Sequence, residues 1–184
     1  MEALYKIKKG ILPQLSEQQL VDCSGSYGNA GCGGGLMTNA YNYLKAYSSM
    51  NRVSYPYVGV KGTCKYNAAN GLLKTIGYKN VAKNDPNAHI AALQLGPVSV
   101  AVAASSSTFR LYKSGIISST ACGTSINHAV NMVGYGVSLG TPYWIIRNSW
   151  GTSWGEQGYF KVLRSSTVST SICGILSLSS YPLI

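Results

Sequence analysis

Acidic residues are scarce in this chain of 184 residues, which has 5 Asp and Glu against 15 Lys and Arg and a formal net charge of +10. Charged residues make up only 11% of the chain and hydrophobic residues 46%, a balance that argues against intrinsic disorder. Long hydrophobic runs are also missing. Without about 18 consecutive apolar residues, no membrane-spanning helix is expected.

The positive charge is compatible with a nucleic-acid partner, an acidic surface or an acidic compartment. However, no run of Lys and Arg exceeds two residues, and no stripe of alternating aromatic and basic residues occurs. The sequence therefore favours a scattered basic surface, with no nucleic-acid or membrane partner.

Cysteine and histidine patterns typical of metal sites are absent. No two of the five cysteines form a C-x-x-C pair, and His89 and His128 lie far from any cysteine pair, so we expect no metal. No glycine-rich segment has the spacing of a dinucleotide or phosphate loop, so we expect no cofactor. Widely spaced cysteines indicate disulfides and an oxidising compartment, and the odd count leaves one thiol free or paired outside this sequence. The residues after Met1 contain no signal-peptide core, so the targeting segment of an exported protein would lie outside this sequence.

The first half of the chain is predicted to be helical. Apolar residues at helical spacing predict a helix over residues 1–9, ended by Gly10. Ser16 and Gln19 have the spacing of a capping box at the start of a second helix. A third helix is expected over residues 36–47, followed by a loop over residues 48–73.

The second half is predicted to consist mainly of strands. One helix comes first, with Asp85 as its N-cap and Gly96 as its stop, and His89 within it is expected to be a surface residue. Apolar or aromatic segments between glycine turns then predict strands over residues 98–103, 128–135, 143–148 and 158–163. Helices first and strands second indicate an α+β arrangement or two lobes.

Two segments of the second half, Asn127–Gly136 and Tyr143–Gly151, contain the candidate catalytic residues. His128 opens one strand and Asn148 closes another, so the two side chains can meet on adjacent strands. An Asn carbonyl can fix the tautomer of an imidazole, and Trp150 can cover the pair and exclude water. This is the orienting half of a Cys-His-Asn catalytic group. The alternative is a core histidine beside a core asparagine.

These segments resemble the papain-like cysteine peptidases of the cathepsin L type, and the resemblance covers essentially the whole chain. Further matching segments are Leu15–Cys23, Gly31–Met37, Tyr55–Tyr57, Gly96–Val100, Tyr112–Ile116 and Ser180–Pro182. The resemblance implies an α+β papain-like fold with a helical lobe over residues 1–79, a β-barrel-like lobe over 80–178 and a tail over 179–184 that returns to the first lobe. The central helix of that fold would be largely missing from this sequence.

The resemblance also implies residue roles. His128 would be the general base and acid, Asn148 would orient it, Trp150 would shield their hydrogen bond, and the Gly34–Gly35 backbone would bind extended peptide. The pocket for the side chain two residues before the cut bond would be apolar and lined by Leu36, Met37, Ala101, Ile126, Ala129 and Leu178. A preference for Leu or Phe at that substrate position follows.

The nucleophilic cysteine of the family has no counterpart in these 184 residues; the resemblance implies that it lies upstream of Met1. It also implies the disulfides Cys23–Cys64 and Cys122–Cys173. Cys32 would be a half-cystine whose partner lies upstream, and the competing idea that Cys32 is the nucleophile has no sequence feature that brings His128 beside it.

The implied function is that of a cysteine-type endopeptidase, inactive as these 184 residues alone because the thiol is absent. The alternative is a non-catalytic papain-like homologue with a binding or structural role. Expected partners are peptide or protein substrates, an inhibitory propeptide and cystatin-type inhibitors. Expected locations are the lysosome, the vacuole or the outside of the cell.

Overall fold

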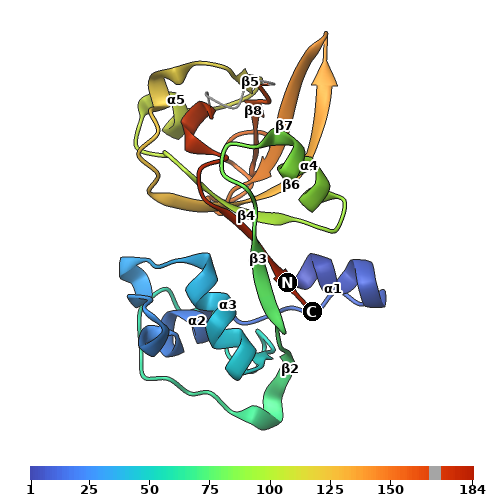
Figure 1. Cartoon of the computed structure of the whole chain (residues 1–184). Helices are drawn as coiled ribbons and strands as arrows, with labels where there is room; N and C mark the ends of the chain where they lie inside the picture. Colours follow the sequence, from blue (N-terminus) through green and yellow to red (C-terminus); the bar gives the residue numbers. More distant parts are fainter. Residues whose placement is uncertain (166–170) are drawn as a thin grey trace. The chain divides into compact units, whose positions relative to one another are not determined.

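The computed structural model describes residues 1–165 and 171–184, which form two compact units. The first unit consists of residues 1–79 with 182–184, and the second consists of residues 80–181. Two strands, β3 (Gly77–Asn80) and β9 (Ser179–Leu183), cross the boundary between the units. Figure 1 traces all the elements along the chain. The mixture of helices and strands confirms the predicted α+β class.

The first unit is mainly helical, as predicted. Its helices and short strands are α1 (Glu2–Lys9), α2 (Glu17–Cys23), α3 (Met37–Ala46), β1 (Ser49–Met50) and β2 (Gly71–Leu73), with 3-10 turns at Gly25–Tyr27, Gly31–Gly33 and Ala68–Asn70. The prediction of a loop over residues 48–73 is wrong at both of its ends, because β1 and β2 pair there as antiparallel strands. Strands of two and three residues are too short to produce a readable alternation of apolar and polar residues.

The first two helices begin and end largely as the sequence predicts. Gly10 closes α1 in the left-handed conformation, with φ of 75°, where glycine avoids the steric cost of a Cβ atom. Ser16 caps α2 by accepting a hydrogen bond at Oγ from the Gln19 main-chain N–H at 3.0 Å. Half of the predicted capping box is therefore present.

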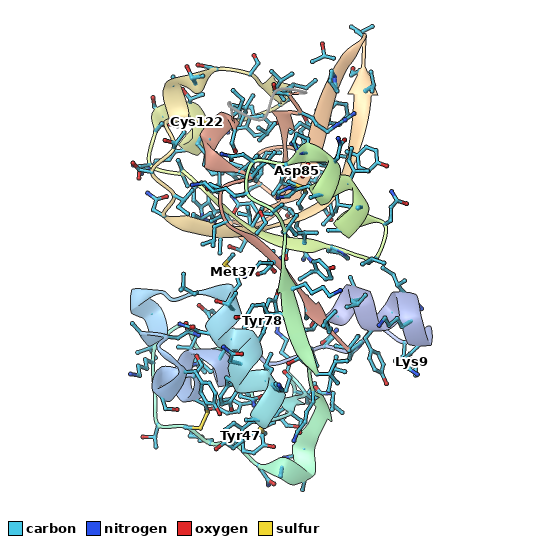
Figure 2. All side chains as sticks on the ribbon, in the orientation of Figure 1. Lys9, Met37, Tyr47, Tyr78, Asp85 and Cys122 are labelled. Atoms are coloured by element: carbon cyan, nitrogen blue, oxygen red, sulfur yellow. A yellow bond between two sulfur atoms is a disulfide. The ribbon has the colours of Figure 1, made fainter. Side chains whose placement is uncertain are left out.

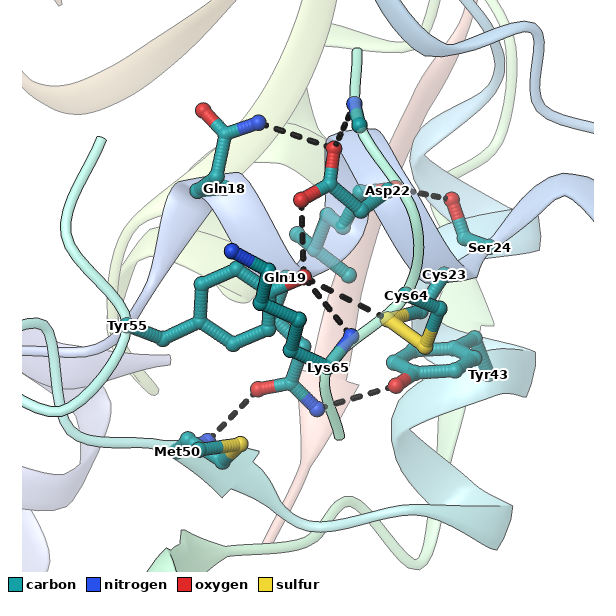
Figure 3. The surroundings of a disulfide bond; sticks show 12 residues. Gln18, Gln19, Asp22, Cys23, Ser24, Tyr43, Met50, Tyr55, Cys64 and Lys65 are labelled. Atoms are coloured by element: carbon teal, nitrogen blue, oxygen red, sulfur yellow. Dashed lines mark hydrogen bonds between the residues drawn. A yellow bond between two sulfur atoms is a disulfide. The ribbon is translucent and has the colours of Figure 1, made fainter. Parts of the chain in front are cut away.

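The other half of the capping box does not form, because the Gln19 side chain points into the core of the first unit. Its Nε2 donates to Tyr43 Oη at 3.0 Å and to the Ser48 carbonyl at 2.9 Å, and its Oε1 accepts from the Met50 N–H at 2.6 Å. Gln19 is fully buried, and these contacts, drawn in part in Figure 3, satisfy its amide. Its side chain thus joins α2 to α3 and β1.

Asp22 is the centre of a second polar network, beside the disulfide shown in Figure 3. Its carboxylate accepts hydrogen bonds from Gln18 Nε2 at 2.9 Å, Tyr55 Oη at 2.7 Å and the Gly62 N–H at 2.7 Å. Burial raises the pKa of the Asp22 carboxyl, but these three hydrogen bonds favour the ionised form and hold the pKa below its usual value. Asp22 is therefore an anion that ties α2 to the segment between β1 and β2.

The second unit is built on a sheet, with its strands in the order β9-β4-β6-β7-β8-β5. The remaining strands and helices are α4 (Pro86–Leu93), β4 (Val98–Val102), α5 (Ser107–Arg110), β5 (Ile116–Ile117), β6 (His128–Ser138), β7 (Thr141–Arg147) and β8 (Tyr159–Leu163), with 3-10 turns at Thr120–Cys122 and Ile172–Gly174. Figure 1 shows β6 and β7 as a long antiparallel hairpin. In the described part of the chain the sheet does not close into a barrel.

The core of the second unit follows from the alternation of residues along its strands. Met132, Ile146 and Phe160 are register partners across β6, β7 and β8, and each is fully buried. Trp144 and Val162 form a second cross-strand pair on the same layer. The periodicity that predicted these strands is therefore also what builds the core.

The predicted surface position of His89 is wrong. Asp85 caps α4 as expected, accepting from two main-chain N–H groups, and the helix ends at Leu93, before the predicted stop at Gly96. His89 on this helix has 0% relative exposure and lies in the core of the second unit. Helix α4 carries apolar residues on nearly every side, and a helix of that kind is normally buried.

Candidate active site

Main-chain pairing at the ends of two strands fixes the positions of His128 and Asn148 in the second unit. His128 is the first residue of β6 and is the register partner of Val102 in β4. Asn148 follows the last residue of β7 directly, and its N–H donates to the Gly158 carbonyl at 2.8 Å. Because β6 and β7 are neighbours in the sheet, the two side chains meet at its edge.

The His128 imidazole and the Asn148 amide form a hydrogen bond between Nε2 and Oδ1, at 2.8 Å. The same Oδ1 also accepts from the Ser149 main-chain N–H at 2.8 Å. A main-chain N–H can only donate, so it fixes which atom of the amide is the oxygen. His128 Nε2 must then carry a proton and donate it, and in the neutral ring Nδ1 holds the lone pair.

The second ring nitrogen of His128 is unoccupied: among the described residues no hydrogen bond to Nδ1 is present. The His128 side chain is only partly buried, whereas Asn148 is 7% exposed. An imidazole with one nitrogen held and the other available differs from a core histidine with both nitrogens satisfied. It can accept a proton at Nδ1 while Asn148 Oδ1 stabilises the positive charge at Nε2.

Trp150 covers the pair. Its ring stacks on the His128 imidazole at a centroid distance of 5.1 Å and an interplanar angle of 29°. The edges of Phe109 and Trp154 pack against Trp150 at 5.5 Å and 5.2 Å, and Trp154 Nε1 donates to the Arg110 carbonyl at 3.0 Å. Rings arranged edge to face around Trp150 hold it over the imidazole and limit the access of water.

Glu156 fixes the loop that follows Asn148, a role that the sequence analysis missed. Its Oε1 accepts from the Gly115 N–H at 2.8 Å and lies 3.0 Å from Tyr112 Oη, and its Oε2 lies 2.7 Å from Lys161 Nζ. Burial raises the pKa of Glu156, but the contacts with Lys161, Gly115 and Tyr112 lower it below its usual value. Burial, together with the Glu156 contact, raises the pKa of Tyr112. The sequence contains one sign of this role, because Glu156 is the only acidic residue in an aromatic and glycine-rich segment.

The predicted peptide-binding glycines lie just before α3 in the first unit. Gly34 has φ of 102°, in the region that favours glycine, and its carbonyl accepts from the Ala30 N–H at 2.8 Å. A Cβ atom at Gly35 would lie 2.1 Å from Asn29 Oδ1, which itself accepts from the Leu36 N–H at 3.0 Å. The backbone of this segment therefore needs glycine at both positions.

The six predicted pocket residues are divided between the two units. Leu36, which is 49% exposed, and Met37 belong to the first unit. The other four belong to the second unit: Ala101, Ile126, Ala129 and Leu178. Within the second unit the structure brings three of them together, because Ala101 is the register partner of Ala129 and donates its N–H to the Leu178 carbonyl at 3.0 Å.

The described cysteines comprise two disulfides and one free thiol. Cys23–Cys64 and Cys122–Cys173 are bonded, the same pairs that the resemblance implies, and Cys32 is free and exposed in the first unit. Outside residues 166–170, no cluster of three or more His, Cys, Asp or Glu side chains could hold a metal ion. Over the same residues, no helix is long and apolar enough to cross a membrane.

Known proteins resemble the chain along its whole length. The sequence model of the family described as "Papain family cysteine protease" matches residues 1–183. KDEL-tailed cysteine endopeptidase CEP2 of Arabidopsis thaliana is 45% identical in an alignment of 185 residues that covers 100% of this chain and 51% of that protein. The cathepsin L-like proteinase of Fasciola hepatica is 45% identical in an alignment of 188 residues that covers 100% of this chain and 56% of that protein. The chain thus spans about half the length of these curated relatives.

The fold agrees with the sequence matches. The solved structure of bromelain from Ananas comosus in complex with the E64 inhibitor superposes with a TM-score of 0.89 at 40% identity, covering 100% of this chain and 84% of that one. The predicted papain-like fold is therefore confirmed. Together with the family match over residues 1–183, this agreement means that the chain belongs to the papain family of cysteine proteases.

Proposed function

We propose that the protein is a cysteine-type endopeptidase in which His128 moves protons and Asn148 orients it. The observation that carries the proposal is the 2.8 Å hydrogen bond between His128 Nε2 and Asn148 Oδ1 beneath the Trp150 ring. It leaves Nδ1 as the basic nitrogen, available to a thiol. Family membership supports the reaction class.

The proposed reaction has two halves. First, a cysteine thiol gives its proton to His128 Nδ1, and the thiolate attacks the carbonyl carbon of the scissile peptide bond. The tetrahedral intermediate collapses to a thioester as Nδ1–H passes its proton to the leaving amine. In the second half a water molecule gives a proton to Nδ1 and attacks the thioester, and the released thiolate takes the proton back.

The thiol in this proposal is not one of the five cysteines of the chain. Four are bonded in disulfides, and a disulfide sulfur cannot serve as the attacking thiolate. Cys32 is a free thiol of the first unit, but nothing in the structure supports its activation by a base. We assign the nucleophile to sequence outside these 184 residues, since the curated relatives are about twice as long. The 184 residues alone are then inactive.

The proposed substrates are polypeptides with a hydrophobic residue two positions before the cut bond. In this proposal the Gly34–Gly35 backbone binds the peptide as a strand. All six proposed pocket residues are apolar: Leu36, Met37, Ala101, Ile126, Ala129 and Leu178. An inhibitory propeptide and cystatin-type inhibitors are the proposed regulatory partners.

The proposed location is a lysosome, a vacuole or the extracellular space. The two disulfides support this location, because such bonds form and persist in oxidising compartments.

Covalent labelling tests the proposal without knowledge of the substrate. The full-length protein is incubated with the E64 inhibitor, which occupies the related bromelain, and the labelled peptide is mapped by mass spectrometry. We expect one inhibitor per chain, on a cysteine other than the five described, and strongly slowed labelling in His128→Ala. Labelling of Cys32 would assign the nucleophile to the first unit. Absence of any label would favour the non-catalytic, binding or structural alternative.

A further inference from the structure

His89 is a fully buried histidine that joins helix α4 to strand β9 within the second unit. It has 0% relative exposure. Its Nδ1 lies 2.7 Å from the Asp85 carbonyl oxygen one turn earlier in α4, and its Nε2 lies 2.8 Å from Ser179 Oγ at the start of β9. Asp85, labelled in Figure 2, marks the beginning of this helix. Both ring nitrogens are therefore engaged, one by each element.

The partners of His89 determine its tautomer. A main-chain carbonyl can only accept, so Nδ1 carries the proton and donates it to Asp85. Nε2 of the neutral ring is then an acceptor, and the Ser179 hydroxyl donates to it. This arrangement satisfies both nitrogens of the neutral buried imidazole.

Protonation reverses one of these hydrogen bonds. With a proton on Nε2 both ring nitrogens donate, so the Ser179 hydroxyl has to accept, and its own proton then has no acceptor among the described residues. The new positive charge would also lie where no water reaches it. Burial accordingly lowers the pKa of His89 below its ordinary value of 6.5, and the hydrogen bond to the Asp85 carbonyl and the Asp85 charge oppose this only in part.

The charged and titratable groups around His89 are few. Asp85, on its own helix, uses its carboxylate to cap the Asn87 and Ala88 N–H groups. The Trp144 ring of β7 lies 6.2 Å from the imidazole, and the Arg164 guanidinium lies 5.6 Å from that same ring. Strand β4 has no ionisable side chain. Strand β6 carries Tyr135, which lies edge-on to Trp144, and strand β9 carries Tyr181. Only Asp85 favours the imidazolium.

Two residues that are adjacent in sequence to Asp85 and Ser179 already have unsatisfied polar atoms. Asn84 precedes Asp85 and has a buried Oδ1, and Ser180 follows Ser179 and has a buried Oγ. Neither atom has a hydrogen-bond partner among the described residues. A buried polar atom without a hydrogen-bond partner destabilises the folded structure. The residue before Asp85 and the residue after Ser179 therefore each contain one such atom already.

We propose that the His89–Ser179 contact is an acid-sensitive latch, which holds α4 against β9 while the imidazole is neutral and releases the two elements when it is protonated. The inference does not depend on the proposed peptidase activity, since it concerns only the second unit. The main-chain hydrogen bonds next to this contact are the ones expected to break when it is released. The Val81 N–H donates to the Ser179 carbonyl at 3.0 Å, and Ser179 and Ser180 pair with β4.

The direction of the effect follows from proton linkage. Above pH 6.5 His89 is neutral in both the closed and the open states, and the latch is at full strength. As the pH falls below 6.5, His89 is protonated in the open state but remains neutral in the closed state. The opening equilibrium constant then rises up to about tenfold per pH unit, until the pKa of the closed state is reached.

Hydrogen exchange tests the latch in the full-length protein. Protection factors, corrected for the intrinsic pH dependence of exchange, are measured at pH 7.5 and pH 5.5 for peptides covering residues 81–93 and 172–184. The variants are His89→Gln, which can hydrogen-bond but does not titrate, and His128→Gln as the matched control, because it removes the other histidine of these 184 residues. The protection factors of strand β7 (Thr141–Arg147) serve as the internal reference for those of the two peptides.

We expect protection of both peptides to fall several-fold at pH 5.5 in the wild type and in His128→Gln, but not in His89→Gln. Equal pH dependence in all three proteins would overturn the proposal. If His89→Gln does not fold, titration of the His89 ring protons by NMR in the folded wild type decides the question. A midpoint below 6.5, accompanied by loss of β9 protection, supports the latch, and a midpoint at or above 6.5 contradicts it.

Discussion

The two histidines of the chain occupy opposite environments in the same unit. His89 is fully buried and donates through Nδ1 to a main-chain carbonyl, while its Nε2 accepts from Ser179. His128 is only partly buried and donates through Nε2 to Asn148, and among the described residues its Nδ1 has no partner. The two rings are therefore held in opposite neutral tautomers.

The comparison shows that the second ring nitrogen decides what a histidine can do. When both nitrogens are satisfied inside the core, as in His89, protonation can only weaken the structure. When one nitrogen is held and the other is available, as in His128, protonation is a usable chemical step.

Replacing His128 by Ala in the full-length protein should lower kcat/KM for a fluorogenic peptide with Leu or Phe two residues before the cut by at least about 10²–10⁴-fold, since general acid–base transfer is lost. His89→Gln should keep the wild-type kcat at pH 7.5, because His89 takes no part in the reaction. Steady-state kinetics on the two variants, with circular dichroism to verify folding, check this contrast. Equal losses of kcat in both variants would contradict it.

Asn148→Ala should have a smaller effect on the same reaction. Asn148 transfers no proton but stabilises the His128 imidazolium through one hydrogen bond, and such a bond to a charged group contributes about 1.5–3 kcal/mol. That range corresponds to a loss of about 10- to 100-fold in kcat/KM. A loss as large as that of His128→Ala would mean that Asn148 does more than orient the ring.

Ser179→Ala should lower the free energy of unfolding at pH 7.5 by about 1–3 kcal/mol, because it leaves the buried Nε2 of His89 without a donor. Its neighbour provides a matched control: Ser180 is equally buried, but its Oγ has no partner among the described residues. Ser180→Ala should therefore be neutral or slightly stabilising. Urea unfolding monitored by tryptophan fluorescence measures both variants. Equal destabilisation would show that the hydroxyl of Ser179 is not paired with His89.

Much of the local structure could be predicted because it depends on residues that are close in sequence. The caps at Ser16 and Asp85 and the stop at Gly10 need only a few neighbouring residues, and each forms as expected. The positions of His128 and Asn148 could be anticipated because one opens and the other closes a segment that predicts a strand, and these two strands are neighbours in the sheet. The papain-like fold came from the resemblance rather than from these local patterns.

Two of the wrong predictions concern side chains whose partners are distant in the sequence. The Gln19 amide bonds to residues 24–31 positions away rather than to its own cap, and His89 finds Ser179 90 positions later. Polar residue types suggested local or surface roles in both cases. A long-range hydrogen bond reverses that preference, since it removes the cost of burying the polar group. The almost uniformly apolar helix around His89 was the only local sign of its burial.

The proposed roles of both histidines depend on the tautomers of their imidazole rings, which can be measured. Long-range proton–nitrogen NMR spectra of the full-length protein at pH 8, recorded after alkylation of free thiols, report which nitrogen of each histidine carries the proton. The account predicts Nε2–H for His128 and Nδ1–H for His89. An Nδ1–H tautomer for His128 would contradict it, because the nitrogen assigned to take the thiol proton would already be occupied.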